Sequence, residues 1–210
     1  MLIGFRSLIS PRVCLFCGQG HEYLCKSCFS NNFLCPEISY LSNVPIVSMS
    51  RYQDLVREVI VRHKDHHFVA VRKYLTSSLV TALQILNIPK DCLIVSIPTA
   101  KWQIMKRLDD PIRFMVADAA AKLGLRFNHK ILKLKAPKRD QVGLNLWQRE
   151  KNVSEIFEVT RKIPKVVVCD DVITSGATLK SANKVLADAG IRVLANICVA
   201  NTPKMAQNLI

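Results

Sequence analysis

The chain has 210 residues, a formal net charge of +14, and hydrophobic side chains at 50% of its positions. This length allows one sizeable core with a small appendage, and the composition excludes a disordered or fibrous protein. No apolar stretch approaches the roughly 18 residues that span a bilayer, and the first residues contain no signal-peptide cleavage site. We therefore expect a cytoplasmic protein without membrane insertion.

The positive charge is distributed unevenly along the sequence. Residues 111–165 contain thirteen Lys and Arg residues against five acids, which gives this segment a net charge of +8. A basic region of this density favours polyanions such as nucleic acid or phosphorylated metabolites. A solvated lysine-rich surface would give the same count, so both interpretations stay open.

The first 45 residues contain two closely spaced pairs of cysteines. Cys14-x-x-Cys17 and Cys25-x-x-Cys28 are separated by seven residues. Four thiolates at this spacing are typical of a tetrahedral zinc site that is closed to solvent and structural. Redox-active dithiols are the alternative. We expect residues 1–45 to be a zinc-knuckle module that depends on the metal for much of its stability.

Two other residues of this segment bear on the same site. His21 lies between the cysteine pairs and could replace one of the ligands. Cys35 follows the second pair and is expected to be a spare, buried thiol.

The middle of the sequence alternates between helical and strand patterns. Residues 51–66 and 68–86 place apolar side chains at three- and four-residue steps, which predicts two amphipathic helices. Residues 92–97 are a short continuous apolar run, which is typical of a strand buried on both faces. Residues 111–124 predict another helix, which starts with a proline and ends at a glycine. Residues 133–153 are polar, basic and non-periodic, and they predict a long loop.

The last part of the sequence predicts a strand, a helix and a second strand. Residues 165–170 and 192–200 are apolar runs, and residues 178–189 between them have helical spacing. This order and spacing predict a βαβ unit and hence a parallel sheet. We therefore expect an α/β fold in which residues 46–210 form one domain behind the zinc-binding module.

A phosphate site is predicted at the end of the 165–170 strand. Two acids there are followed by a loop of small and hydroxyl-bearing residues that opens a helix, where backbone N–H groups and the helix N-terminus attract anions. Adjacent carboxylates can bind the hydroxyls of a sugar and help to hold a divalent cation. An ordinary turn capped by the acids is the alternative. The expected binding residues are Asp170, Asp171, Thr174, Ser175, Gly176, Ala177 and Thr178.

Residues 166–178 resemble the motif that binds phosphoribosyl pyrophosphate (PRPP) in type I phosphoribosyltransferases. The resemblance implies that Asp170 and Asp171 contact the ribose hydroxyls and that residues 174–178 surround the 5′-phosphate. It also implies Mg²⁺ as the companion of PRPP. The implied fold is a type I phosphoribosyltransferase-like parallel sheet flanked by helices.

A four-cysteine module ahead of this motif resembles the ComF family, the competence protein F group linked to DNA uptake in natural transformation. Further segments that carry the resemblance are Arg62-His63-Lys64, Gln141-Val142-Gly143-Leu144, and Arg149 and Asn152 ahead of Phe157. One segment departs from the family. Where the family has Arg-Gly-Phe-Asn-Gln, this chain has Arg107-Leu108-Asp109-Asp110-Pro111, and two acids there would repel a pyrophosphate.

The resemblance implies a protein that binds PRPP or ribose 5-phosphate and supports passage of single-stranded DNA, with DNA-uptake machinery proteins as partners. Cations would bind the DNA phosphates and an aromatic residue would stack on a base. The residues expected to bind DNA are Lys133, Lys135, Lys138, Arg139, Trp147 and Arg149. One alternative is a metabolic phosphoribosyltransferase, which transfers ribose 5-phosphate from PRPP to a nitrogenous acceptor. The other is a degenerate phosphoribosyltransferase fold that serves only as a scaffold, with the zinc knuckle as a docking surface. Enzymatic activity stays open.

Overall fold

The computed structural model describes residues 13–20, 22–66, 68–107, 109–135 and 156–202. The helices are α1 (Lys26–Phe33), α2 (Asp54–Asp65), η2 (Val69–Val71, a 3₁₀ helix), α3 (Arg72–Ile85), α4 (Lys101–Arg107), α5 (Pro111–Lys122) and α7 (Ala177–Asp188). The strands are β1 (Glu37–Leu41), β2 (Val44–Ser48), β3 (Leu93–Ser96), β4 (Arg126–Phe127), β5 (Leu132–Leu134), β6 (Phe157–Val159), β7 (Lys165–Ile173) and β8 (Arg192–Asn201).

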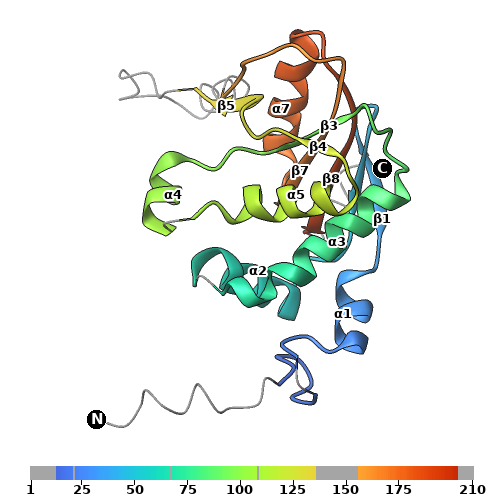
Figure 1. Ribbon diagram of the computed structural model, residues 1–210, viewed down its shortest axis with the longest axis vertical. Coiled ribbons are helices and arrows are strands. Elements are labelled where there is room, and N and C mark those ends of the chain that lie inside the picture. The colour runs from blue at the N-terminus through green and yellow to red at the C-terminus, as the bar shows by residue number, and fades with distance from the viewer. Residues whose placement is uncertain (1–12, 21, 67, 108, 136–155, 203–210) are drawn as a thin grey trace.

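The central sheet has six strands in the order β1-β2-β8-β7-β3-β4. Within it, β1 and β2 pair antiparallel, and every other neighbouring pair is parallel. Figure 1 shows the helices arranged around this sheet. The predicted α/β fold, a mostly parallel sheet flanked by helices, is therefore confirmed. Strands β5 and β6 pair antiparallel in a separate ribbon.

The core has two parts because β7 is buried on both faces. Val167 and Cys169 pack into the larger cluster with side chains of α2, α3 and α5, whereas Val166 and Val168 pack with side chains of α7 and of the β5–β6 ribbon. Successive strand residues point to opposite faces, so a strand covered on both sides needs apolar residues at every position. This requirement explains why the apolar run predicted the strand correctly.

The N-terminal segment contains more regular structure than its sequence predicted. Helix α1 starts within the second cysteine pair, and β1 and β2 extend the central sheet through the parallel pairing of β2 with β8. The predicted division at residue 45 falls inside β2. Residues 37–45 thus pack with the main sheet, and the division into two domains stays a prediction.

The cysteine-containing segment packs against α3 mainly through Tyr74. The Tyr74 hydroxyl donates to Glu22 at 2.8 Å and accepts from the backbone N–H of Leu24 at 3.2 Å. Lys73 forms an ion pair with the same glutamate at 2.7 Å. Phe33 at the end of α1 is fully buried in the larger core. These contacts join the segment to the rest of the protein.

Three predictions need correction in detail. Residues 165–170 were predicted as a strand, but β7 continues to Ile173 because its last residues keep pairing with β8. The loop predicted over 133–153 starts inside β5, whose partner β6 lies far along the chain, and residues 136–155 lie outside the described part. Cys35 is exposed, not buried. In the described part of the chain, no helix is long and apolar enough to cross a bilayer.

Candidate phosphate site and cysteine cluster

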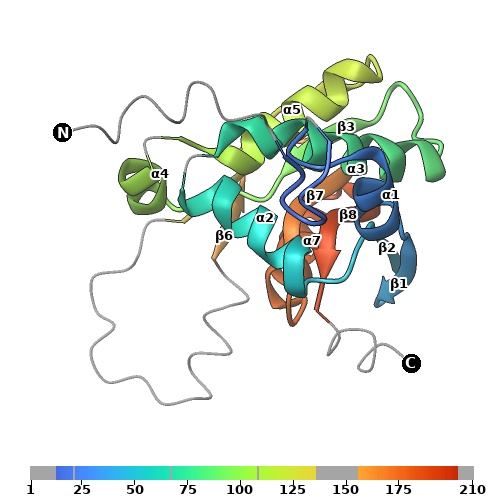
Figure 2. The same cartoon turned by 90° about the horizontal axis from the view of Figure 1, so that it is seen from below.

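The predicted phosphate site lies at the carboxyl ends of the parallel strands. Val172 and Ile173 at the end of β7 pair with Ala200 and Asn201 at the end of β8. Figure 1 shows these two strands ending above α2, and Figure 2, seen from below, shows α2 in front of the same edge. Ligands of open parallel sheets bind beyond this edge.

The loop between β7 and α7 is held by its neighbours. Thr202 donates its backbone N–H to the carbonyl of Ile173 and its hydroxyl to the carbonyl of Thr174, both at 2.9 Å. Gly176 precedes α7 with a φ of 74°, a left-handed conformation that glycine adopts without steric cost. Thr174 and Ser175 are exposed. The loop is thus fixed at its base and open at its tip.

The start of α7 has free hydrogen-bond donors. Among the described residues no side chain caps this helix, and the N–H of Ala177 has only a long contact of 3.4 Å to the Ser175 hydroxyl. The first helical hydrogen bond runs from the N–H of Lys180 to the carbonyl of Gly176 at 2.8 Å. The N–H groups before it point out of the helix end, where they can bind an anion. The structure thus brings together all five predicted loop residues.

The two predicted carboxylates lie near the end of β7, separated from this loop by Val172 and Ile173, and they are buried. Asp170 is 8% exposed and Asp171 is 5% exposed. One oxygen of Asp171 accepts the N–H of Val172 at 2.7 Å, and the other lies 2.7 Å from the ammonium of Lys64. One oxygen of Asp170 accepts the N–H of Asp171 at 2.9 Å.

The surroundings of Asp170 change how readily it ionises. Burial raises the pKa of Asp170, and the negative charge of Asp171 raises it further, whereas the Lys64 ammonium acts in the opposite direction. The raised pKa favours the protonated form of Asp170, in which the carboxyl group can donate as well as accept a hydrogen bond.

Lys64 is a site residue that the pattern of the strand and loop did not predict. It lies in the last turn of α2, more than a hundred residues before its partner Asp171. The signal in the sequence was the resemblance of residues 62–64 to a ComF segment. Burial and the Arg72 guanidinium lower the pKa of the neighbouring His63, so the imidazole is neutral and Lys64 provides the cation.

Asp109 and Asp110, the two acids of the segment that departs from the ComF pattern, have partners within the protein. Asp110 caps α5 by accepting the N–H of Arg113 at 3.2 Å, and it accepts the Thr99 hydroxyl at 3.1 Å. Asp109 forms an ion pair with Arg72 at 3.3 Å. The charge expected to repel a pyrophosphate is therefore partly compensated within the protein.

The four cysteines of the N-terminal segment converge in space. Cys14, Cys17, Cys25 and Cys28 present sulfur atoms that all lie within 4.8 Å of one another, so they can hold a metal ion. The N–H of Cys25 donates to the sulfur of Cys14 at 3.4 Å, and the N–H of Cys28 donates to the sulfur of Cys25 at 3.5 Å. His21, the possible substitute ligand, lies outside the described residues.

The thiols of this cluster titrate very differently. Burial acts to raise the pKa of Cys14, but hydrogen bonds from the backbone at Cys17, Cys25 and Phe16 outweigh it and lower the pKa to about 6. Burial and hydrogen bonds with the neighbouring thiols raise the pKa of Cys28 to about 12. Cys14 thus forms a thiolate readily, whereas its neighbours make ionisation of Cys28 unfavourable. A bound metal cation would favour the thiolate form of both.

Only part of the predicted DNA-binding set can be placed. Lys133 lies on β5 and Lys135 follows it directly, and both side chains are exposed. The N–H of Lys135 donates to the carbonyl of Ile156 at 2.9 Å, which continues the pairing with β6. The other residues lie outside the described part: Lys138, Arg139, Trp147 and Arg149.

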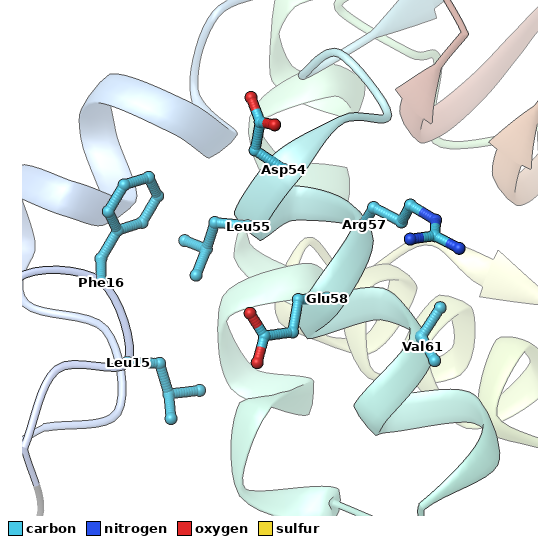
Figure 3. Close-up of a pocket in the computed structure, with 7 residues that line it drawn as sticks. All are labelled: Leu15, Phe16, Asp54, Leu55, Arg57, Glu58 and Val61. Atoms are coloured by element: carbon cyan, nitrogen blue, oxygen red, sulfur yellow. The ribbon is translucent and has the colours of Figure 1, made fainter.

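A separate groove of about 600 Å³ lies between the cysteine-containing segment and α2 (Figure 3). Leu15 and Phe16 form one wall, and side chains of α2 form the other. The residues from α2 are Asp54, Leu55, Arg57, Glu58 and Val61. The groove includes none of the residues predicted to bind phosphate or ribose.

Comparisons with known proteins gave matches among solved structures. No protein-family model matches the sequence, and no curated protein matches it. One adenine phosphoribosyltransferase has 13% identity and a TM-score of 0.48, over 86% of this chain and 92% of its own. The adenine phosphoribosyltransferase from Leishmania tarentolae has 12% identity and a TM-score of 0.45. The match covers 80% of this chain and 83% of that enzyme. An orotate phosphoribosyltransferase from Aeropyrum pernix has 18% identity and a TM-score of 0.34. The match covers 65% of this chain and 80% of that enzyme.

Proposed function

We propose that the protein binds ribose 5-phosphate and PRPP at the carboxyl edge of its sheet. The observation that carries the proposal is a buried Asp171, ion-paired with Lys64 near the end of β7, just ahead of an open loop at the start of α7. The helix start offers N–H groups to a phosphate, and the carboxylate offers acceptors to ribose hydroxyls. These two kinds of site, a few residues apart on one strand end, match the two ends of a phosphorylated sugar.

The further part of the proposal is a ComF-like role in DNA uptake in the cytoplasm, where the protein handles single-stranded DNA with partners of the uptake machinery. Two features support it beyond the phosphate site. The cysteine cluster has the ligands and spacing preferred by structural Zn²⁺. The exposed Lys133 and Lys135 lie at the edge of the most basic part of the sequence. Neither feature is needed to bind a small phosphosugar.

Replacing Asp171 by Asn should weaken ribose 5-phosphate binding about ten- to hundredfold, since a charge-assisted hydrogen bond contributes roughly 1.5–3 kcal/mol. Inorganic phosphate should be affected much less because it occupies only the loop. The measurement is calorimetric titration of both variants with both ligands. Asp188→Asn is the matched control, because this aspartate lies at the far end of α7 in an exposed ion pair with Lys184. Equal losses for both ligands would contradict the assignment of Asp171 to the ribose.

Binding of single-stranded DNA should fall steeply with salt. Neutralising Lys135, Lys138 and Arg139 together should lower the slope of log K against log salt by roughly two, at about 0.7 per phosphate contact. The measurement is fluorescence anisotropy of a labelled oligonucleotide over a salt series. A control variant with three exposed lysines replaced elsewhere, Lys26, Lys90 and Lys184, should keep the wild-type slope. If both variants change the slope equally, the charge acts only as a diffuse basic surface.

A further inference from the structure

The ribose carboxylates already have a cation from the protein. The ammonium of Lys64 lies 2.7 Å from one oxygen of Asp171, and the other oxygen accepts a backbone N–H. Asp171 is 5% exposed, and the oxygen that faces Lys64 is buried. A magnesium ion binds oxygen at about 2.0–2.1 Å in an octahedron and usually keeps several of its waters. Each oxygen already has one partner in the protein, so a metal ion would have to share an oxygen with the ammonium or with the N–H, whereas a ribose hydroxyl needs only a remaining lone pair.

The position of Lys64 also opposes a metal by its charge. A divalent ion that coordinated the same oxygen of Asp171 would lie only a few ångströms from the ammonium, where like charges repel strongly in a buried environment. The lysine is held at this place by its helix. Val59, Ile60 and His63 of α2 are buried in the core beneath it. The Mg²⁺ that the resemblance implies therefore does not fit Asp171 while Lys64 is present.

We propose that Lys64 replaces the divalent cation beside Asp171 and holds this carboxylate in place for the ribose hydroxyls. The inference rests on the proposed function, because it concerns the same ribose-binding carboxylates. It makes Lys64 a positioning residue, which acts on the ligand through Asp171. It also means that ribose 5-phosphate, which has no pyrophosphate to carry a metal, binds without Mg²⁺.

The test is calorimetric titration with ribose 5-phosphate, with and without added Mg²⁺, in metal-depleted buffer that contains no chelator and so spares the cysteine cluster. The wild type should bind equally well in both buffers. Lys64→Met should bind about ten- to hundredfold more weakly without Mg²⁺ and should recover when Mg²⁺ is added. Its affinity for inorganic phosphate should not change. Lys184→Met is the control, since this lysine forms an exposed ion pair on α7, and it should behave as the wild type.

Two results would overturn the inference while the proposed function stands. These are a wild type that needs Mg²⁺ for ribose 5-phosphate, and a Lys64→Met variant that matches the wild type without it. Thermal melting checks that the variant folds, and Lys64→Gln replaces it if it does not.

If the wild type binds no ribose 5-phosphate in either buffer, the proposed function fails, and Mn²⁺ titration followed by electron paramagnetic resonance decides the role of Lys64 alone. Lys64→Met should then bind one Mn²⁺ that the wild type does not bind. The double variant with Asp171→Asn should lose this ion. A Lys64→Met variant that gains no Mn²⁺ would overturn the inference.

Discussion

Gly176→Val is expected to abolish binding of both inorganic phosphate and ribose 5-phosphate. Gly176 directly precedes α7, is buried, and has a φ of 74°. A branched side chain at this place would keep an anion away from the N–H groups of the helix start. It would also force a β-branched residue into a conformation that such residues rarely adopt. We expect at least about a hundredfold loss in calorimetric titrations, which is about 2.8 kcal/mol.

The structure provides a matched control for the backbone strain. Gly190 follows the other end of α7 with a φ of 76°, and a Cβ at this position would meet no atom within 4 Å. Gly190→Val should therefore carry similar strain without touching the ligand, and it should bind phosphate normally. If Gly176→Val does not fold, Gly176→Ala and Gly190→Ala provide a milder pair. Equal phosphate affinities within the pair would mean that the loop does not bind the phosphate.

The fold was predictable where burial imposes a simple pattern. Strands covered on both faces, such as β3 and β7, need unbroken apolar runs, and α7 between two such strands implies a parallel unit. The short edge strands β1 and β4 have no such requirement. They pair on one side only, and their sequences carry no comparable signal. Strand β5 escaped prediction because its partner β6 lies beyond a long intervening segment.

The site was predictable to the extent that it is local in sequence. Asp170, Asp171 and residues 174–178 follow one another along the chain, so a single pattern contains them. Lys64 and Thr202 reach the same place from α2 and from the end of β8, through tertiary structure. Their roles depend on distances that no local pattern encodes. The cysteine cluster is also local in sequence, because the spacing of its two pairs alone predicts that the four sulfur atoms converge.

Cys14→Ser is expected to release the metal and destabilise the N-terminal segment. Wild-type protein purified without added metal should contain about one Zn²⁺ per chain, and the variant should contain almost none. Structural zinc contributes about 10–16 kcal/mol to the folding of isolated zinc fingers. Here the contacts of Tyr74 and Phe33 with the main core should retain part of the structure. We therefore expect a loss of the order of several kcal/mol and rapid proteolysis between residues 13 and 35.

Cys35→Ser is the matched control for this prediction. Its thiol is exposed, lies outside the cluster, and contacts the carbonyl of Asn31 at 3.2 Å. This variant should keep its zinc and its resistance to protease, which separates loss of the ligand set from loss of any cysteine. Elemental analysis and limited proteolysis of the three proteins give the answer. A metal-free wild type that resists protease would show that Tyr74 and the α1 contacts alone hold the segment. Loss of zinc without faster proteolysis would separate metal binding from stability, because the expected coupling depends on the metal joining Cys14 to the start of α1.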